Sequence, residues 1–456
     1  MSAAAETVVK ETAEQTAVVK QWLQRVEKRE LRIGIIGLGY VGLPLALLFS
    51  EEKFRVTGFD IDRKKVDTLN SGNSYIHRIE PHHIAAAQSS GFKATSDFKE
   101  IAEMDAILIA VPTPLSDHHT PDMSYIELTM QALAPHLHAG QLLVLESTTY
   151  PGTTEEIVVP AVELPGKAKV VRGNGDTGVF VAFSPEREDP GNTKVHRRDI
   201  PKVVGGIEPQ ATAMAAAIYN TAFHRVVRVS SPAAAEMTKL LENIYRCVNI
   251  ALVNELKLLC LRMGIDIWEV IEAASTKPFG FQAFYPGPGL GGHCIPIDPF
   301  YLSWKAKEFD FHTRFIELAG EVNEAMPAHV VQSVMKALNT QRKALNGARV
   351  LLLGLAYKKD VDDLRESPAL TIIELLQEEG AMVDYNDPFF PTVGQGRKYH
   401  LNKKSVPLSE IPTYDCVVIV TDHSSYNYPQ VVEHSQLVVD SRNATRGIES
   451  KKITHC

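Results

Sequence analysis

The sequence predicts an α/β protein in which two doubly wound domains are joined by a long central helix. Three observations indicate this fold class: a glycine-rich turn after the first apolar segment, a second run of alternating strands and helices near the C-terminus, and one unbroken helical pattern between them. The 456 residues exceed the roughly 250–300 that one hydrophobic core supports. We therefore expect a helical extension at 1–30, a first α/β domain at 31–225, a central helical region at 226–335 and a second α/β domain at 336–456.

The composition is that of an ordinary soluble globular protein, with 45% hydrophobic and 22% charged residues. A net charge of -8 gives no reason to expect nucleic acid or an anionic membrane as a partner. Residues 1–30 alternate acids and bases, lack the apolar core of a signal peptide and predict an exposed amphipathic helix. Five cysteines make no disulfide framework. We expect a cytoplasmic protein without a metal site.

The first α/β domain opens with LRIGIIGLGYVGL, residues 31–43, an apolar strand that runs into Gly37, Gly39 and Gly42. A helical pattern follows, and the next apolar segment ends at Asp60, eighteen residues after Gly42. Such glycines let a pyrophosphate lie on the helix N-terminus, and the acid accepts hydrogen bonds from a ribose. The unit predicts a Rossmann-like domain that binds NAD and disfavours NADP. The alternative is a glycine turn in a generic strand–helix unit.

Three further strands are expected at 105–114, 141–153 and 179–188. Each ends in a small polar or proline-rich loop. Ligands bind at this edge of an open parallel sheet, so these loops are expected to line a site.

The central helix is expected from Ser231, a good N-cap followed by proline, to Gly264, a good stop. It is apolar on several faces, so it forms an interdomain spine, with or without a dimer interface. Lys239, Asn243 and Arg246 are spaced at i, i+4 and i+7 and therefore share one face. The alternative for this face is a salt-bridged polar stripe.

The C-terminal part repeats the strand–helix alternation. A strand and turn are expected at 347–358, a helix at 367–380, and a strand at 381–388 that ends in the acid Asp387. The loop after its first strand lacks a glycine fingerprint and carries basic residues instead, namely Lys358, Lys359 and Arg365. They suit a phosphate or carboxylate, or they belong to a solvated charged loop.

Cys294 lies in GPGLGGHCIPIDPF, residues 287–300, and is either a bystander in a turn or a nucleophile. Oxidation of an aldehyde to an acid benefits from a thiol, because the thiohemiacetal gives its hydride to NAD and the thioester is then hydrolysed. The neighbouring glycines would let the aldehyde carbon approach and would offer N–H groups to an oxyanion. Asp298, four residues on, is placed to orient a base or a water.

The motifs GIIGLGYVGLPLA, VPTP, STTYPGT, SPERE, KLLEN, GGHCIPID and GLAYKKDVDDLRES occur in the order seen in UDP-sugar 6-dehydrogenases. The chain resembles that family from residue 31 to about 450. The resemblance implies that carbon 6 of a UDP-sugar is oxidised twice by NAD to give a UDP-uronic acid. It also implies an NAD domain, a UDP domain, and a homodimer or larger homo-oligomer formed by the long helix.

The resemblance assigns roles to individual residues. It makes Cys294 the nucleophile, Lys239 a proton-transfer or oxyanion residue, Asn243 a hydrogen-bond donor near the reacting carbon, Asp298 a support for the base or water, Glu186 the acid in thioester hydrolysis, and Thr148 a contact of cofactor and water. Implied cofactor contacts are Gly37, Gly39, Tyr40, Val41, Gly42, Asp60, Lys65, Thr113, Thr148 and Arg365. Implied substrate contacts are Arg187, Glu188, Lys239, Asn243, Arg246, Gly291, Tyr357, Lys358 and Arg442.

Departures from the UDP-glucose branch concern the sugar. His293 and Ile297 replace the serine and lysine usual there, Pro190 replaces a frequent glutamate, and residues 276–286 lack the usual arginine. These features resemble enzymes acting on N-acetylated UDP-hexosamines, UDP-N-acetylglucosamine most of all. UDP-N-acetylmannosamine, UDP-N-acetylgalactosamine and UDP-glucose remain alternatives. A decarboxylating hydroxyacid dehydrogenase or a non-catalytic NAD-binding scaffold is more remote, since neither needs Cys294.

Overall fold

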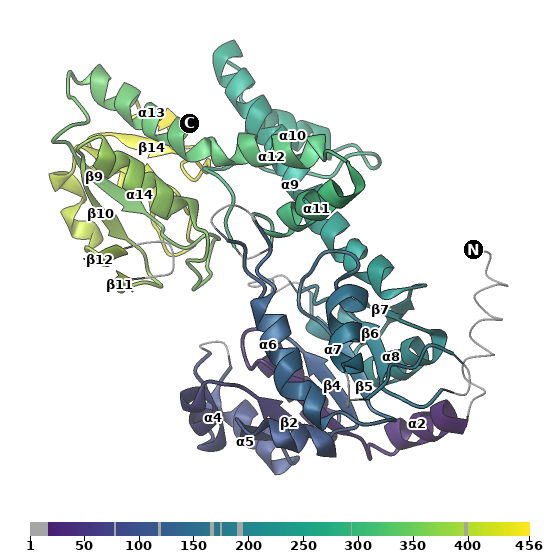
Figure 1. Ribbon diagram of the computed structural model, residues 1–456. Coiled ribbons are helices and arrows are strands. Elements are labelled where there is room, and N and C mark those ends of the chain that lie inside the picture. The colour runs from purple at the N-terminus through teal and green to yellow at the C-terminus, as the bar shows by residue number, and fades with distance from the viewer. Residues whose placement is uncertain are drawn as a thin grey trace. The chain divides into compact units, whose positions relative to one another are not determined.

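The computed structural model describes residues 17–76, 79–116, 120–164, 168–173, 176–188, 195–292, 294–395 and 400–456 (Figure 1). The chain divides into two compact units, Met1–Glu242 and Asn243–Cys456. Each unit contains a parallel or mainly parallel β-sheet with helices on both faces. The expected α/β class with two doubly wound parts is therefore confirmed.

The first unit is built on a sheet of eight strands among its described residues. Their order is β3 (Lys93–Thr95), β2 (Arg55–Phe59), β1 (Arg32–Ile36), β4 (Ala106–Ile109), β5 (Leu142–Leu145), β6 (Phe180–Phe183), β7 (Lys202–Gly206) and β8 (Val226–Arg228). The order 3-2-1-4-5-6 is that of a dinucleotide-binding sheet, whose ligand lies beyond the carboxyl ends of the strands. The fully apolar cores of β4, β5 and β6 are typical of strands covered on both faces.

Helices cover both faces of this sheet (Figure 1). One apolar core contains side chains of α3 (Gly42–Glu51) and α8 (Pro209–Ala222), and the other contains side chains of α6 (Ser124–Leu133) and α7 (Val159–Glu163). Two further α-helices of this unit are α4 (Arg63–Asn70), which contacts β3, and α5 (Pro81–Ser89), which contacts α3.

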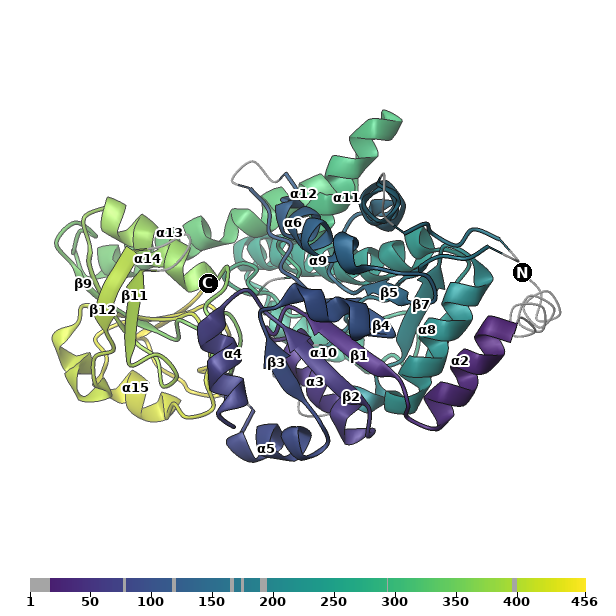
Figure 2. The same cartoon turned by 60° about the horizontal axis from the view of Figure 1, so that its bottom comes forward.

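The N-terminal helix is not exposed in the way that the sequence predicted. Its described part, α2 (Ala17–Glu27), is amphipathic, but Val19, Trp22 and Val26 are buried against α8 of the same chain (Figure 2). The Trp22 Nε1–H donates to the carbonyl oxygen of Met214 at 3.1 Å. The apolar face of α2 thus completes the first core, while Lys20, Gln24 and Glu27 lie on its exposed side.

Two strands of the first sheet, β7 and β8, depart from the expected parallel pattern, because β8 pairs parallel to the reversed β7. β7 runs antiparallel to β6, with Ala182 opposite Gly206 and Phe183 opposite Gly205. The start of β7 therefore lies beside the carboxyl end of β6, at the edge where ligands bind.

The central helix has the predicted limits. α9 spans Pro232–Met263, with Ser231 Oγ accepting from Ala234 N at 3.2 Å and Gly264 adopting φ +70°. It begins in the first unit and continues into the second. It is followed by α10 (Ile267–Ser275), α11 (Asp298–Ala306), α12 (Arg314–Glu324) and α13 (Met326–Thr340).

The second sheet is fully parallel, with order β10 (Met382–Asn386), β9 (Arg349–Leu353), β13 (Cys416–Ile419), β14 (Val438–Asp440) and β15 (Ile453–His455). Side chains of α13 and α14 (Pro368–Glu378) pack into one core of this sheet, and those of α15 (Tyr428–His434) pack into the other. The sequence did not indicate the small hairpin of β11 (Thr392–Gln395) and β12 (His400–Lys404). Among the described residues, no helix combines the length and hydropathy that crossing a membrane requires.

The two sheets share one local design. In each sheet, a glycine with positive φ follows the first strand, and its N–H donates to the carbonyl oxygen of the residue that precedes an acid. Gly37 donates to Phe59, before Asp60, at 2.8 Å, and Gly354 donates to Asn386, before Asp387, at 2.9 Å. Asp387, the acid of the second sheet, accepts from the backbone N–H groups of Leu355 and Ala356 at 2.6 and 3.0 Å. Its carboxylate also bonds the buried His423 ring at 3.1 Å.

Candidate active site

Three glycines, Gly37, Gly39 and Gly42, lie in the turn between β1 and the start of α3. The absence of a side chain matters at each of them for a different physical reason. Gly37 adopts φ +87°, and a Cβ there would lie 2.6 Å from the Ala110 carbonyl oxygen. A Cβ on Gly42 would lie 1.9 Å from the Gly37 carbonyl oxygen, so α3 packs directly on the turn. Gly39 has nothing within 4 Å of that position. Its open side gives a pyrophosphate access to the backbone at the start of α3.

Asp60 lies directly against this turn. Its Oδ2 accepts from Leu38 N at 3.0 Å and faces Lys65 Nζ at 3.4 Å, while its Oδ1 accepts from Asp62 N at 2.9 Å. The predicted ribose acid and glycine turn are thus brought together by β1 and β2. The other predicted cofactor residues of this unit are Tyr40, which is exposed in the turn, Val41, which directly precedes α3, and Thr113, which is buried in the loop after β4.

Lys239 of α9 is buried and donates a hydrogen bond from Nζ to Thr148 Oγ1, in the loop after β5. Glu236, one turn earlier on α9, holds the same loop. Its carboxylate accepts from Gly152 N at 2.6 Å and from Thr154 N at 2.9 Å. Burial raises the pKa of Glu236 to about 7, although these donors favour its charged form. α9 therefore holds this loop at two points, through Lys239 at Thr148 and through Glu236 at Gly152 and Thr154.

Glu186 follows β6 at the same edge of the sheet. Its Oε1 accepts from the N–H groups of Arg187 and Glu188 at 2.8 and 2.9 Å, and its Oε2 faces Lys202 Nζ at 3.4 Å. Lys202 also donates to Glu146 Oε2 at 2.7 Å. The predicted acid is thus held in a buried network of charges at the carboxyl edge.

Arg187 and Glu188, which resemblance assigns to the substrate, have ion-pair partners in the first unit. Arg187 Nε donates to Glu242 Oε2 at 3.1 Å, and the Glu188 carboxylate pairs with the Arg197 guanidinium. Their assignment to substrate remains a prediction.

The turn after Cys294 leads directly into α11. The Cys294 carbonyl oxygen accepts from Asp298 N at 2.8 Å and from Ile297 N at 3.2 Å. Asp298 is fully buried in the first turn of the helix, and its Oδ2 accepts from Asn243 Nδ2 at 2.6 Å. Three predicted catalytic residues, Cys294, Asp298 and Asn243, are therefore linked through one turn.

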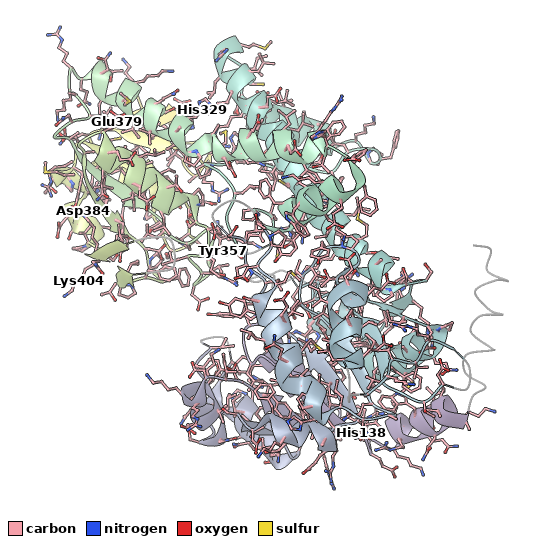
Figure 3. All side chains as sticks on the ribbon, viewed as in Figure 1. His138, His329, Tyr357, Glu379, Asp384 and Lys404 are labelled. Atoms are coloured by element: carbon pink, nitrogen blue, oxygen red, sulfur yellow. The ribbon has the colours of Figure 1, made fainter. Side chains whose placement is uncertain are left out.

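The glycines before Cys294 are required by packing within the protein, which differs from the predicted reason. A Cβ on Gly291 would lie 2.5 Å from Tyr357 Cβ, and one on Gly292 would lie 2.9 Å from the Tyr357 ring. Tyr357, labelled in Figure 3, belongs to the loop after β9. Gly292 N also donates to the Arg365 carbonyl oxygen at 2.8 Å. The glycines bring the cysteine loop against the predicted substrate loop.

The remaining predicted residues of this unit are distributed over three elements. Arg365 pairs with Asp363 at 2.7 Å, and Arg442, after β14, donates from Nε to the Val420 carbonyl oxygen at 3.0 Å. Burial lowers the pKa of Arg442. Arg246 on α9 and Lys358 in the loop after β9 are half-buried. His293 and Pro190, used above to judge the sugar, lie outside the described residues.

Glu146, Lys202 and Glu236 were not predicted from the sequence. An acid directly after the apolar LLVL strand was a visible signal for Glu146, and Lys202 opens the apolar segment KVVGG. Their partnership was not visible, because 56 residues separate Glu146 from Lys202. No group of His, Cys, Asp and Glu suited to a metal occurs among the described residues.

Comparison with protein families gives matches along most of the chain. The UDP-glucose/GDP-mannose dehydrogenase family matches with its NAD binding domain over residues 31–223, its central domain over 233–325 and its UDP binding domain over 351–447. These matches confirm NAD as the cofactor. The UDP binding domain indicates a UDP-sugar as the substrate.

Individual relatives extend over nearly the full length. The chain is 34% identical over 399 residues to a UDP-N-acetyl-D-glucosamine 6-dehydrogenase of Pseudomonas aeruginosa, covering 87% of this chain and 92% of the relative. It is 36% identical over 429 residues to the UDP-N-acetyl-D-mannosamine dehydrogenase of Escherichia coli strain K12, covering 91% and 99%. A solved UDP-D-ManNAc dehydrogenase from Pyrococcus horikoshii superposes with a TM-score of 0.82 at 32% identity, covering 93% of this chain and 99% of that one. The chain therefore belongs to the UDP-glucose/GDP-mannose dehydrogenase family.

Proposed function

We propose that the protein oxidises the 6-hydroxymethyl group of a UDP-N-acetylhexosamine to the carboxylate, with UDP-N-acetylglucosamine preferred. The conversion removes four electrons, and each NAD accepts two, so two NAD are reduced for each sugar. The second oxidation needs one water. The family resemblance assigns the residues proposed for this chemistry, and the geometry within each unit supports them.

The observation that carries the proposal is the link between Cys294, Asp298 and Asn243. An alcohol dehydrogenase that stops at the aldehyde or ketone has no use for a thiol. Here the cysteine turn is fixed by Asp298 N, and the Asp298 side chain binds the Asn243 amide at 2.6 Å. A thiol in such a fixed turn is suited to form a thiohemiacetal, and then a thioester, with the aldehyde carbon.

The first unit supplies the cofactor site and a lysine for proton transfer or oxyanion stabilisation. NAD, when bound, accepts the hydride at each oxidation. Gly39 leaves space for its pyrophosphate, and Asp60 holds its ribose. Lys239, bonded to Thr148 Oγ1, is proposed to move the hydroxyl proton or stabilise the oxyanion.

The N-acetylated sugar is supported by the cysteine loop and by the relatives as a whole. The Gly-rich cysteine loop resembles enzymes of the N-acetylhexosamine branch, and the relatives cited above are named for N-acetylglucosamine and N-acetylmannosamine. The preference for the gluco epimer rests on the loop resemblance alone.

A panel assay tests the proposal. Purified protein is supplied with NAD and, separately, with UDP-N-acetylglucosamine, UDP-N-acetylmannosamine, UDP-N-acetylgalactosamine and UDP-glucose. We expect two NADH per sugar and the highest kcat/KM for UDP-N-acetylglucosamine. Another N-acetyl epimer as the best substrate would change only the sugar, whereas one NADH per substrate would favour a hydroxyacid dehydrogenase and no NADH a binding scaffold.

We also propose that the protein is a cytoplasmic homodimer that associates through α9. Exposed apolar side chains recur along this helix at Leu241, Tyr245, Leu252, Leu256 and Leu259. Their spacing places them along one side of the helix. An apolar stripe of this kind on a long helix is suited to pack against a second copy.

A further inference from the structure

A buried lysine joins two glutamates at the edge of the first sheet. The Lys202 side chain is 3% exposed, and its Nζ lies 2.7 Å from Glu146 Oε2 and 3.4 Å from Glu186 Oε2. The Glu146 side chain is fully buried, whereas that of Glu186 is 17% exposed. Of the two acids, Glu186 alone has access to solvent.

The direction of β7 explains why a cation is found there. Pairing of Phe183 with Gly205 in an antiparallel register, continued three residues along β6, places Glu186 opposite Lys202. A parallel β7 would begin at the other edge of the sheet, far from the carboxyl end of β6. The reversed direction of β7 therefore places a positive charge at the edge where Glu146 and Glu186 lie.

The position of Lys202 is fixed from the other side as well. Tyr219 of α8 donates from its hydroxyl group to Glu146 Oε1 at 2.5 Å. Lys202 Nζ lies 5.1 Å from the centre of the Tyr219 ring and 5.6 Å from that of Phe223. Aromatic faces attract a cation at this distance, so the ammonium group is held between two rings and two carboxylates.

We propose that Lys202 is a positioning residue that keeps Glu186 ionised and oriented as the base for thioester hydrolysis. This inference rests on the proposed function. Glu186 accepts a proton from water as the water oxygen bonds to the thioester carbon. The carbon–sulfur bond then breaks, the sulfur leaves as the Cys294 thiolate, and the proton on Glu186 returns to solvent or thiolate. No electrons are transferred in this step.

The charges around Glu186 support an ionised carboxylate. Burial alone would raise the pKa of Glu186, but Lys202 and Arg197, with the backbone N–H of Glu188, outweigh it and lower the pKa. Burial would lower the pKa of Lys202, but Glu146 and Glu186 raise it, so Lys202 stays charged. The charged and titratable groups that face Glu186 are Lys202 of β7, Glu146 after β5, Lys239 of α9, Arg197 of the 3-10 turn Arg197–Asp199, Tyr219 of α8, and Arg187 and Glu188 of its own loop.

Lys202→Met tests the proposal through the pH dependence of hydrolysis. Without the ammonium charge the pKa of Glu186 rises. The acidic limb of the kcat–pH profile should therefore move up by about one pH unit, which lowers kcat about tenfold at pH values below the new pKa. KM for UDP-N-acetylglucosamine should stay within about twofold, because Lys202 is not assigned to substrate. The covalent thioester on Cys294 should accumulate and be visible by mass spectrometry.

Additional variants separate the loss of the Lys202 charge from misfolding. Lys202→Met alone leaves Glu146 as a lone buried charge, whereas Lys202→Met/Glu146→Gln removes both charges of the pair. The double variant should show the same upward shift of the acidic limb of kcat, whereas Glu146→Gln alone should not. Lys202→Arg should restore the original limb, and Lys403→Met, which breaks the pair with Asp384 in the second unit, is the matched control.

A limb that stays in place in a folded Lys202→Met or double variant overturns the proposal and leaves Lys202 with a purely structural role. The charge effect can also be measured without substrate. The ¹³Cδ resonance of Glu186, assigned by its loss in Glu186→Gln, should titrate at higher pH in Lys202→Met. This measurement separates failure of the Lys202 role from failure of the proposed function, which is decided by the NADH count of the unmodified protein.

Discussion

Cys294 combines two tasks, because its carbonyl oxygen starts α11 while its thiol is the proposed nucleophile. The glycines and prolines around it in the sequence identified this residue, but they did not indicate that Gly291 and Gly292 pack on Tyr357. A glycine pattern shows that something approaches closely. It does not show whether a ligand or another part of the protein does so.

Cys294→Ala should lower formation of the uronic acid by about a thousandfold or more, because no thioester can form. The backbone bonds of the turn do not use the thiol, so the fold and NAD binding should persist. Product analysis measures the acid, and Cys294→Ser is expected to trap an ester that mass spectrometry detects. Acid formation near the unmodified rate in Cys294→Ala would make the cysteine a bystander.

Asp60→Ala should raise KM for NAD by roughly tenfold or more, since a charge-assisted hydrogen bond to the ribose is lost, and should change kcat less. The preference for NAD over NADP should fall as well, because Lys65 remains near a 2′-phosphate while the repelling carboxylate is gone. Steady-state kinetics with both cofactors measures this. Asp62→Ala, which removes only the N-cap of α4, is the control and should leave cofactor preference unchanged.

Among the elements, α9 was predicted almost to the residue, because Ser231, Pro232 and Gly264 are local signals that act within a few residues. β7 was not identified, nor was its direction, because the reversed direction of β7 and β8 on one side of an otherwise parallel sheet is decided by contacts distant in sequence. The same holds for Lys202 and Glu146, which are linked only through that strand. Helix caps and turns can be predicted from a single sequence, whereas strand partners and ion pairs between distant segments cannot.

Leu256→Glu on α9 should convert a dimer into monomers, because it places a charge in the apolar stripe. Light scattering coupled to gel filtration gives the mass. Glu255→Ala, beside the stripe on an exposed position, should leave the dimer intact. A monomeric unmodified protein, or a dimer that survives Leu256→Glu, would remove α9 from the association.

The stability of the folded molecule depends on pH through carboxyl groups buried inside its units. Glu236 has a folded pKa of about 7 against 4.5 for the free group, so the folded state holds its proton more tightly. The free energy of unfolding should therefore fall by about 3 kcal/mol as pH rises from below 4.5 to above 7.

Glu236→Gln should lack this fall, so its stability relative to the unmodified protein should improve with rising pH. Urea unfolding of the first unit can be followed from Trp22 in a Trp268→Phe/Trp304→Phe background. Glu127→Gln, which removes an exposed carboxylate of α6 in the same unit, is the control. Parallel pH curves for unmodified protein and Glu236→Gln would contradict the assigned pKa.

The matched glycine–acid designs of the two sheets have a consequence for the order of events. In the first, Asp60 Oδ2 accepts from one N–H of the turn and faces Lys65, and its Oδ1 accepts from Asp62 N. In the second, a single oxygen of Asp387, Oδ2, is bonded to Leu355 N, Ala356 N and the buried His423 ring. An acid engaged in this way has little capacity left for a ribose, so we expect calorimetry to find one NAD per chain. Under the proposed function, the first NADH must then depart and a fresh NAD must arrive while the sugar is half oxidised. A covalent bond to Cys294 would tether the aldehyde during that exchange and keep a reactive intermediate from diffusing away.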